Sequence, residues 1–452
     1  MTLEGIVMAK GRSRLVTSEQ IDLAANMRLT LSVEPKNDIT ILAVAESIAA
    51  LLSSSDPVGE QTMIMEEPSG GRISLAIPAA FARPELGLTQ LLNLLSVPAE
   101  YDHCRALIFE NLELPRGHLA HYRGPRFGVT GLRNAFGVPE GPILGAILKP
   151  RQIYNLHRAL DSVVELASAN LDFLVDDELM VDTVQAPFDE RVGRVVDALK
   201  PSRRGGRAST VFVANVTARP SQASEFAQMA KSLGAGGIVT NPIVAGFGAV
   251  EDLADAGLDM PIFATNMGTA LLAKGPGQGR FAGFTESLVG KLTRLAGADA
   301  IHGGIDKSDW YATSPTQGAI NVLNGPLPEI KQAFRIIAGG LDVVRMIDNW
   351  PLDGEPVIFE AGSSIFSHPG GVRAGANAMR TAWEIAREHM TSEEASRDVT
   401  MAAIALASEH DSALAGALEA SKWSPNVEVR AAMRKLPLRT GIFKRIWKRV
   451  SR

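Results

Sequence analysis

The feature that most constrains the fold of this chain is a pattern that occurs eight times in succession. Each repeat starts with a short run rich in Val, Ile, Leu and Phe, ends in a polar residue or a glycine, and continues into a helical stretch. Near-continuous apolar content is typical of parallel strands that helices cover. The predicted strands are residues 143–149, 172–177, 210–215, 237–241, 261–266, 298–302, 335–340 and 357–362.

Eight strand–helix units predict a TIM (β/α)8 barrel, an α/β fold that needs about 250 residues. The chain of 452 residues is long enough for this barrel and a further domain. An open doubly wound sheet is the alternative, but no Gly-x-Gly-x-x-Gly turn follows an early strand. We therefore expect a C-terminal barrel over residues 136–430.

The segment before the barrel predicts a second domain with a different order of elements. Strand-like and helix-like stretches follow one another as strand, helix, strand, strand, helix, strand, which is the order of a ferredoxin-like α+β domain. We assign this N-terminal domain to residues 1–135, with the Gly-, Pro- and Arg-rich stretch 115–142 as the connection. The predicted elements are residues 27–33, 39–52, 62–66, 72–77, 86–95 and 103–109.

The last segment, residues 431–452, is a basic tail in which Lys and Arg recur among apolar residues. Such a pattern is typical of a terminal helix with a solvated basic face. Contact with an anionic partner or a membrane surface is the alternative.

Composition argues against several classes of protein. The net charge of −5 is small for this length, so nucleic acid is not expected as a partner. Cys104 is the single cysteine, which excludes an intrachain disulfide and a cysteine metal cluster and fits a reducing compartment. No apolar run approaches the length of about 18 residues that a membrane span needs, and the N-terminus lacks a signal-peptide pattern. We expect a cytoplasmic protein with no membrane partner.

The residues that close the eight runs are the candidate site, because TIM-barrel enzymes carry their sites at the C-terminal ends of the strands. These residues are polar, ionisable or glycine. In chain order they are Lys149, Asp176, Asp177, Glu178, Asn215, Asn241, Asn266, His302, Gly339, Gly340, Gly362, Ser363 and Ser364.

Lys149 and the acidic run after the second strand suggest two kinds of chemistry. An ammonium at the mouth of a dry barrel is suited to proton transfer or to stabilising an oxyanion. Three adjacent carboxylates, Asp176, Asp177 and Glu178, need a cation or hydrogen bonds to neutralise them, and Mg²⁺ prefers such oxygen ligands. Salt bridges among these residues and to nearby arginines are the structural alternative.

His302 and the glycines of the last two strands suggest phosphate binding. His302 precedes two glycines and is a candidate acid/base or phosphate donor, although a buried structural histidine is the alternative. Gly339 and Gly340 close the seventh strand and Gly362 the eighth, where barrels often bind phosphate through backbone N–H groups. Ordinary tight turns would also use glycine here.

Several ordered motifs among these strand ends resemble the large chain of RuBisCO and its non-fixing relatives, the RuBisCO-like proteins. The resemblance covers the barrel and, more faintly, the N-terminal domain. The matching segments are Gly145-Ala-Ile-Leu-Lys-Pro150, Leu171-Asp-Phe-Leu-Val-Asp-Asp-Glu178, Ala300-Ile-His-Gly-Gly304, Ala338-Gly-Gly340, Ala361-Gly-Ser-Ser364 and His368-Pro369.

This resemblance implies roles for individual residues. Lys149 matches the lysine that handles the substrate proton, and Asp177 and Glu178 match two Mg²⁺ ligands. His302 and the glycine and serine segments match phosphate-binding loops. The family also implies a homodimer or higher oligomer, in which the N-terminal domain of one subunit covers the barrel mouth of its partner.

Departures from the family pattern indicate a different reaction. The lysine that CO₂ carbamylates is here Val175, so no carbamylated lysine is expected and the Mg²⁺ site is expected to be weakened or absent. The strand-five histidines and arginine are replaced by a run that ends at Asn266. Lys307 comes too early to match the lysine of the sixth loop, and the N-terminal Thr-Trp pair and active-site asparagine have no clear counterparts.

The sequence therefore predicts a RuBisCO-like enzyme that does not fix CO₂. We expect it to form an enolate or enediolate from a phosphorylated ketose or keto sugar acid, as an isomerase, a tautomerase or a decarboxylase-type lyase. Lys149 and His302 are the predicted catalytic residues, with Asn215, Asn266, His302, Gly339, Gly340, Gly362, Ser363 and Ser364 binding substrate. A sugar-phosphate-binding or regulatory protein without turnover is the alternative, and a true carboxylase is not expected.

Overall fold

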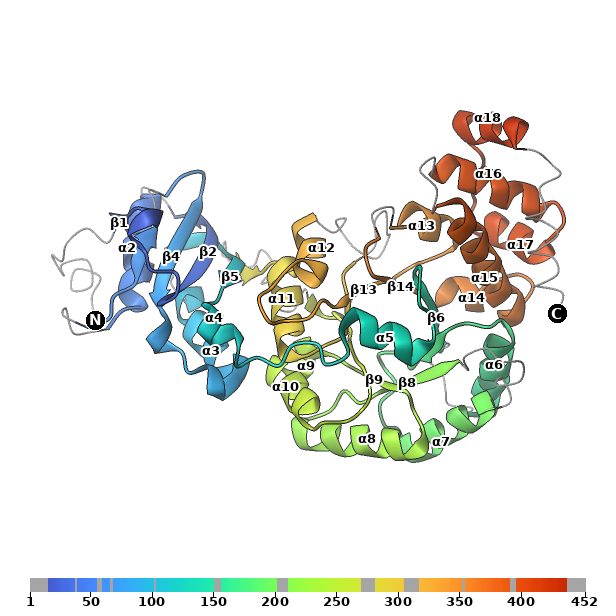
Figure 1. Cartoon of the computed structure of the whole chain (residues 1–452), viewed down its shortest axis with the longest axis horizontal. Helices are drawn as coiled ribbons and strands as arrows, with labels where there is room; N and C mark the ends of the chain where they lie inside the picture. The colour runs from blue at the N-terminus through green and yellow to red at the C-terminus, as the bar shows by residue number, and fades with distance from the viewer. Residues whose placement is uncertain are drawn as a thin grey trace.

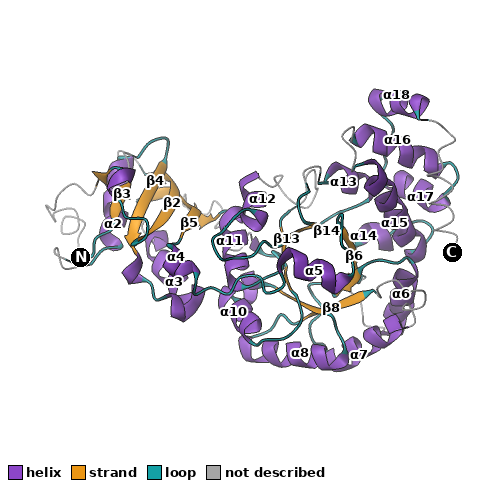
Figure 2. Cartoon of the chain, viewed as in Figure 1, coloured by secondary structure: helices purple, strands orange, loops and turns teal. Residues whose placement is uncertain are grey.

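The computed structural model contains an N-terminal sheet domain beside a closed barrel, with further helices at the C-terminal end (Figure 1). Helices surround the barrel strands (Figure 2). The structure describes residues 15–36, 39–54, 59–65, 68–100, 103–149, 156–200, 210–269, 281–304, 317–351, 354–390 and 396–436.

Eight parallel strands close the barrel in the order β10-β12-β13-β14-β6-β7-β8-β9. All eight strands predicted from the sequence are confirmed, although most are shorter than predicted because the polar residue that closes a run often lies beyond the last paired position. The strands are β6 (Ile143–Ile147), β7 (Phe173–Val175), β8 (Val211–Asn215), β9 (Gly237–Thr240), β10 (Ile262–Ala264), β12 (Ala300–His302), β13 (Phe334–Ile337) and β14 (Val357–Ala361).

Helices follow the strands and form the outer layer. One of them, α11, shows clear local signals at both ends: the hydroxyl of Thr285 accepts a hydrogen bond from Leu288 N at its start, and Gly297 ends it in a left-handed conformation. The helices are α6 (Leu156–Ser168), α7 (Phe188–Leu199), α8 (Pro220–Leu233), α9 (Pro242–Ala245), α10 (Phe247–Asp255), α11 (Glu286–Ala296), α12 (Gln317–Asn324), α13 (Val343–Asp348), α14 (Ser363–Phe366) and α15 (Val372–His389).

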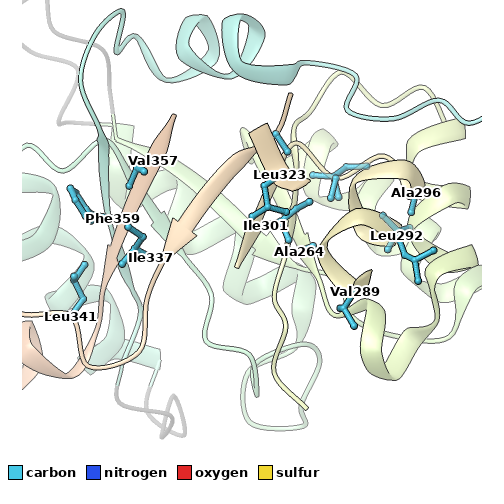
Figure 3. Packing of buried hydrophobic residues seen from close by; sticks show 14 of the residues in the cluster. Ala264, Val289, Leu292, Ala296, Ile301, Leu323, Ile337, Leu341, Val357 and Phe359 are labelled. Carbon is cyan, nitrogen blue, oxygen red and sulfur yellow. The ribbon is translucent and has the colours of Figure 1, made fainter. Parts of the chain in front are cut away.

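Alternation along the strands divides the barrel core into two clusters. In β14, Ile358 belongs to the cluster inside the barrel, whereas Val357 and Phe359 belong to the cluster between strands and helices. Figure 3 shows side chains of this second cluster, among them Ile301 of β12 and Leu292 of α11. Because side chains on a strand alternate between faces, this division identifies which strand-end residues face the barrel axis.

The helix α5 (Gly128–Phe136) closes the N-terminal end of the barrel. The ring of Phe136 stacks on Phe173 with centroids 5.6 Å apart, and Leu132 joins the same inner cluster. The buried carboxylate of Asp299 accepts hydrogen bonds from Phe127 N at 2.7 Å and Gly128 N at 2.9 Å, which fixes the start of the helix. The expected domain boundary after residue 135 falls inside α5, and by its contacts this helix belongs to the barrel.

The N-terminal domain has the ferredoxin-like arrangement that the sequence predicts. Its sheet has the order β1-β3-β4-β2-β5-β11, and β2 pairs antiparallel with β4 and β5. The elements are β1 (Leu15–Val16), β2 (Asn26–Pro35), α2 (Ile41–Leu51), β3 (Met63–Met65), β4 (Arg72–Pro78), α3 (Gly87–Ser96) and β5 (Cys104–Glu113).

One strand of this sheet comes from the barrel half of the chain. Strand β11 (Phe281–Phe284) lies in sequence between two barrel strands but pairs in parallel with β5. The hydroxyl of Thr285, directly after it, donates to Glu110 O at 3.0 Å, and Lys291 Nζ of α11 donates to Asn111 Oδ1 at 3.1 Å. The two domains therefore share a sheet edge, which the sequence analysis did not predict.

The C-terminal helices α16 (Arg397–Ser408), α17 (Ser412–Ala420) and α18 (Val427–Lys435) pack near α15. The predicted basic tail begins within α18, and from residue 437 onward it lies outside the described residues. In the part of the chain that the structure describes, no helix is long and apolar enough to cross a membrane.

Candidate active site

The mouth of the barrel brings Lys149 together with the two carboxylates that follow β7. Lys149 Nζ bonds to Asp177 Oδ2 and lies 3.9 Å from Glu178 Oε2. The Asp177 side chain is 1% exposed, whereas those of Lys149 and Glu178 are 20% exposed and can be reached by a ligand. A Cβ atom at Gly362 would lie 3.3 Å from Lys149 Cε, so the glycine directly after β14 leaves room for the lysine side chain.

His302 faces the same space and is held by an acid that the sequence analysis missed. Its Nε2 lies 3.5 Å from Oε1 of Glu360, and both side chains are buried. Glu360 is the penultimate residue of β14 and takes an inner-face position by alternation. Its signal in the sequence is an acidic residue within an apolar run, two positions before Gly362, which an inspection of run ends alone overlooks.

Burial and two nearby carboxylates have opposite effects on the pKa of His302. Burial alone lowers its pKa, but the contact with Glu360 and the negative charges of Glu360 and Glu178 raise the pKa, and the net shift is upward. The imidazole therefore tends to carry a positive charge above its ordinary titration range. A cationic His302 is suited to donating hydrogen bonds to an anionic ligand.

We expect Glu360→Gln to lower the pKa of His302, because glutamine keeps the shape but removes the charge. A raised folded pKa contributes stability below the unfolded value of about 6.5, and that contribution is lost as pH rises through the folded pKa. The difference in free energy of unfolding between wild type and Glu360→Gln should therefore shrink with rising pH.

NMR titration of labelled histidines, with the His302 signal assigned from the variant His302→Gln, measures the change in the pKa of His302. Glu190→Gln, which changes an exposed acid on α7, is the control. An unchanged His302 pKa in Glu360→Gln would contradict this account.

Asp176 does not join the mouth. Alternation turns it to the outside of the barrel, where Arg191 of α7 donates to Asp176 Oδ1 at 3.3 Å and Oδ2 at 3.1 Å. Both side chains are fully buried, and burial raises the pKa of Asp176 although Arg191 opposes the shift. For this acid, the salt-bridge alternative considered in the sequence analysis is the one that the structure shows.

Asn215 holds the backbone of the acidic turn. Its Nδ2 donates to the carbonyl oxygens of Asp177 at 3.2 Å and Glu178 at 3.1 Å, and its Oδ1 accepts from Thr217 N at 3.0 Å. These contacts occupy the amide with main-chain groups, so in this structure it positions Asp177 and Glu178.

Asn266 follows β10, and the alternation of side chains along this strand directs it toward the surrounding helices. It lines a small cavity of about 20 Å³ that also includes Glu286 of α11 and reaches His302. Its Oδ1 is buried and has no hydrogen-bond partner among the described residues. Asn266 thus lies on the opposite face of its strand from the barrel axis, and the cavity that it lines reaches the predicted site at His302.

The glycine turns after β13 and β14 lie close to each other. Gly339 and Gly340 have φ values of 89° and 77°, which favour glycine strongly. The hydroxyl of Ser364 donates to Leu341 O at 2.5 Å and ties the two turns together, while Ser363 is exposed. The turns thus present backbone at the mouth on the side of Gly362 and Lys149.

His368 has a structural position. Its Nε2 lies 2.9 Å from Ala413 O of α17, and its Nδ1 accepts from Gly370 N at 3.0 Å. The His-Pro segment therefore joins the C-terminal helices to the barrel. Lys307 and Pro150 lie outside the described residues.

The residues at the mouth do not fit a three-ligand Mg²⁺ site. Val175 belongs to the apolar cluster inside the barrel, where it pairs with Ile147 and Val213 in neighbouring strands. In the described residues, no group of three His, Cys, Asp or Glu side chains could hold a metal ion. Asp177 and Glu178 are present, but Lys149 already contacts both.

Comparisons with known proteins agree with this architecture. A family model described as "Ribulose bisphosphate carboxylase large chain, catalytic domain" matches residues 128–423. The ribulose bisphosphate carboxylase of Pyrococcus furiosus is 26% identical over 379 residues, which cover 77% of this chain and 87% of that protein. A ribulose bisphosphate carboxylase-like protein of Archaeoglobus fulgidus is 28% identical over 288 residues, which cover 62% of this chain and 64% of that protein.

A second Archaeoglobus fulgidus relative, a ribulose bisphosphate carboxylase, is 25% identical over 295 residues, or 62% of this chain and 66% of that protein. Against both Archaeoglobus relatives, this chain spans slightly less than two thirds of their length.

Solved structures show the same fold over nearly the whole chain. The octameric Rubisco of Pyrococcus horikoshii has a TM-score of 0.77 at 21% identity and covers 91% of this chain and 97% of its own. The dimeric Rubisco of Hyperthermus butylicus has a TM-score of 0.73 at 21% identity, with 90% and 97% covered. With the family match over residues 128–423, these likenesses lead to one conclusion: the chain belongs to the RuBisCO large-chain family and carries its catalytic domain.

Proposed function

We propose that this protein is an enzyme that forms an enolate or enediolate from a phosphorylated ketose or keto sugar acid and does not fix CO₂. The observation that carries the proposal is Lys149, whose ammonium lies at the mouth beside Asp177 and Glu178, within reach of a ligand. Enolisation needs a base that removes a proton next to a carbonyl and a positive group near the carbonyl oxygen.

Enolisation moves one proton and two electron pairs. A basic group takes the proton from carbon, the C–H electron pair forms the new C=C bond, and the carbonyl electron pair moves onto oxygen. Lys149 is placed either to take the proton as an amine or to stabilise the oxyanion as an ammonium. Return of the proton to the former carbonyl carbon, with transfer of the hydroxyl proton of the enediol to the oxyanion, completes an isomerisation, whereas in a β-keto acid the electron pair of the C–C bond to the leaving CO₂ forms an enolate.

The phosphate is assigned to the turns beside Lys149. An anion could approach their backbone closely, since Gly340 and Gly362 carry no side chains. His302, with its raised pKa, adds a positive group at the same mouth. An anion held there would place the adjacent carbonyl near Lys149.

Gly362→Asp should abolish phosphate binding, because its carboxylate would put a like charge at the turn and its side chain would crowd the Lys149 side chain. Calorimetric titration with inorganic phosphate measures this, and unchanged affinity would contradict the assignment.

We expect no fixation of CO₂ onto ribulose bisphosphate. Val175 cannot form the carbamate that the family's reaction needs, and it lies in the apolar cluster inside the barrel. Purified protein is incubated with radiolabelled bicarbonate, Mg²⁺ and ribulose bisphosphate. Acid-stable label above the no-enzyme control would refute this prediction.

The second candidate is a sugar-phosphate-binding or regulatory protein without turnover, which the same Val175 and the displaced Asn266 favour. The test separates binding from catalysis. Phosphorylated ketoses and keto sugar acids are screened by thermal shift, since a bound ligand raises the melting temperature. Compounds that bind are then incubated in D₂O. Deuterium entering the carbon next to the carbonyl supports the enzyme, and binding without exchange or bond cleavage supports the second candidate.

We infer that the chain forms at least a homodimer. Apolar side chains are exposed after two barrel strands: Leu179 at 64% and Val184 at 92% in the loop after β7, and Val244 at 60% in α9 after β9. Such a rim at a barrel mouth is suited to burial against a second copy. The relatives of this fold include a dimer and an octamer. Light scattering should return a mass of at least twice 48.2 kDa, and a monomer mass at micromolar concentration would refute the inference.

A further inference from the structure

We propose that the ammonium of Lys149 takes the place of a divalent metal ion in this site, so that Asp177 and Glu178 bind an internal cation rather than Mg²⁺. This inference concerns the ground-state charge of the site and does not depend on which reaction the protein performs.

The first support is the full occupation of Asp177. Its Oδ2 bonds to Lys149 Nζ, and its Oδ1 accepts a hydrogen bond from Leu179 N at 3.0 Å. The side chain is 1% exposed, so neither oxygen faces bulk solvent. A metal ion could use this carboxylate only by displacing the lysine or the backbone amide.

The second support is that the lysine's position is built into the surrounding elements. Gly362 lies where any larger residue would crowd Lys149 Cε, since its ideal Cβ would be 3.3 Å away. Asn215 holds the main chain of Asp177 and Glu178 from the other side through its amide. The ammonium and its two carboxylates are therefore fixed by strands β6, β8 and β14 as well as by the β7 end.

The third support is that, within the described part of the chain, the neighbouring side chains do not complete a metal shell. Val175 lies in the inner apolar cluster, Asp176 turns outward to Arg191, and Glu360 contacts His302. The described residues contain no group of three His, Cys, Asp or Glu that could hold a metal ion. A dication near Lys149 would also be repelled by the ammonium, and this repulsion is strong in a poorly solvated site.

The test measures metal binding directly and needs no substrate. The full-length protein is freed of metal with a chelator, exchanged into chelator-free buffer and titrated with Mn²⁺, whose free form gives a six-line EPR signal. For wild type we expect no loss of the free Mn²⁺ signal at stoichiometric protein. Stoichiometric binding by wild type that Asp177→Asn weakens would overturn the proposal.

Removal of the internal cation should create a metal site. Lys149→Met leaves two carboxylates without their cation, so we expect its affinity for Mn²⁺ to exceed that of wild type by about tenfold or more. Lys149→Gln should behave in the same way and serves if the methionine variant does not fold. The double variant Lys149→Met/Asp177→Asn should lose the gain.

Lys200→Met is the matched control, because Lys200 also pairs with an aspartate, Asp197, but on the exposed surface of α7. It should bind Mn²⁺ no better than wild type. If folded Lys149→Met or Lys149→Gln gains no affinity, Asp177 and Glu178 are not a latent cation site and the proposal fails. Because these outcomes are read without turnover, they stay distinct from a failure of the proposed enolisation.

Discussion

Lys149→Met should reduce turnover of the true substrate by about 10²-fold or more, the usual scale for loss of an acid/base group. Methionine keeps much of the volume of the lysine stem beside Gly362 but removes the charge that faces Asp177 and Glu178. The loss should appear mainly in kcat, because the phosphate is assigned to the glycine turns. Steady-state kinetics on the folded variant, checked by circular dichroism, measures it.

Two further variants sharpen this prediction. Lys149→Arg keeps a positive charge but cannot serve as a base at neutral pH, so partial activity would indicate that the charge alone matters. Lys200→Met changes a lysine–aspartate pair on the surface and should retain full activity. A folded Lys149→Met variant with wild-type kcat would show that the family resemblance assigns the wrong catalytic residue.

Arg191→Met should destabilise the protein by about 3–5 kcal/mol, because it leaves the buried carboxylate of Asp176 without its partner. The guanidinium also donates to Val181 O at 2.7 Å and to Ala186 O at 3.2 Å, and those acceptors lose a donor as well. The midpoint of chemical denaturation, followed by circular dichroism, measures the change.

The pH dependence of this loss has a defined sign. Burial already raises the pKa of Asp176, and removal of Arg191 removes the interaction that opposes this shift. A group with a raised folded pKa contributes stability below its unfolded pKa and loses it as pH rises through the folded value. The variant should therefore be less destabilised at pH 5 than at pH 8.

The control lies on the same helix. Arg194 pairs with Glu190 at 2.9 Å on the exposed side of α7, and Arg194→Met should change stability by less than about 0.5 kcal/mol. The double variant Asp176→Asn/Arg191→Met should recover part of the loss, since it removes the stranded charge. Equal losses of stability in Arg191→Met and Arg194→Met would show that the buried pair of Arg191 and Asp176 contributes no more to stability than the exposed pair.

The sequence predicts the barrel well because its strands face apolar surroundings on both sides. Each run of Val, Ile, Leu and Phe reflects an inner cluster and a helix-facing cluster at once, as Val357, Ile358 and Phe359 illustrate. A different reason explains why strand β11 was not predicted. Strand β11 has four residues and pairs with a distant strand, so no local periodicity reveals it.

The site was predicted in part, and the limit is the direction of individual side chains. Asp176 and Asp177 are adjacent in sequence, but alternation sends one to Arg191 outside the barrel and the other to Lys149 at the mouth. Asn266 closes its run as Asn215 does, yet it turns toward α11. Glu360 was not predicted because only residues at the ends of runs are candidates, and Glu360 lies one residue before the end of β14. A period of two counted back from Asp177 and from Gly362 separates Asp176 from Asp177 and puts Glu360 on the inner face, whereas it does not place Asn266, which is itself the end of its run.

The shared sheet edge has a consequence for how the chain is made. The N-terminal domain is complete only when β11 has joined β5, and the bond from Thr285 to Glu110 spans 175 residues. At about 5–20 residues per second, a ribosome needs roughly ten to thirty seconds to supply that stretch. During this interval β5 is an open strand edge that can pair with another nascent chain. Either domain expressed alone would keep this exposure permanently, one as an uncovered edge and the other as a strand without its sheet.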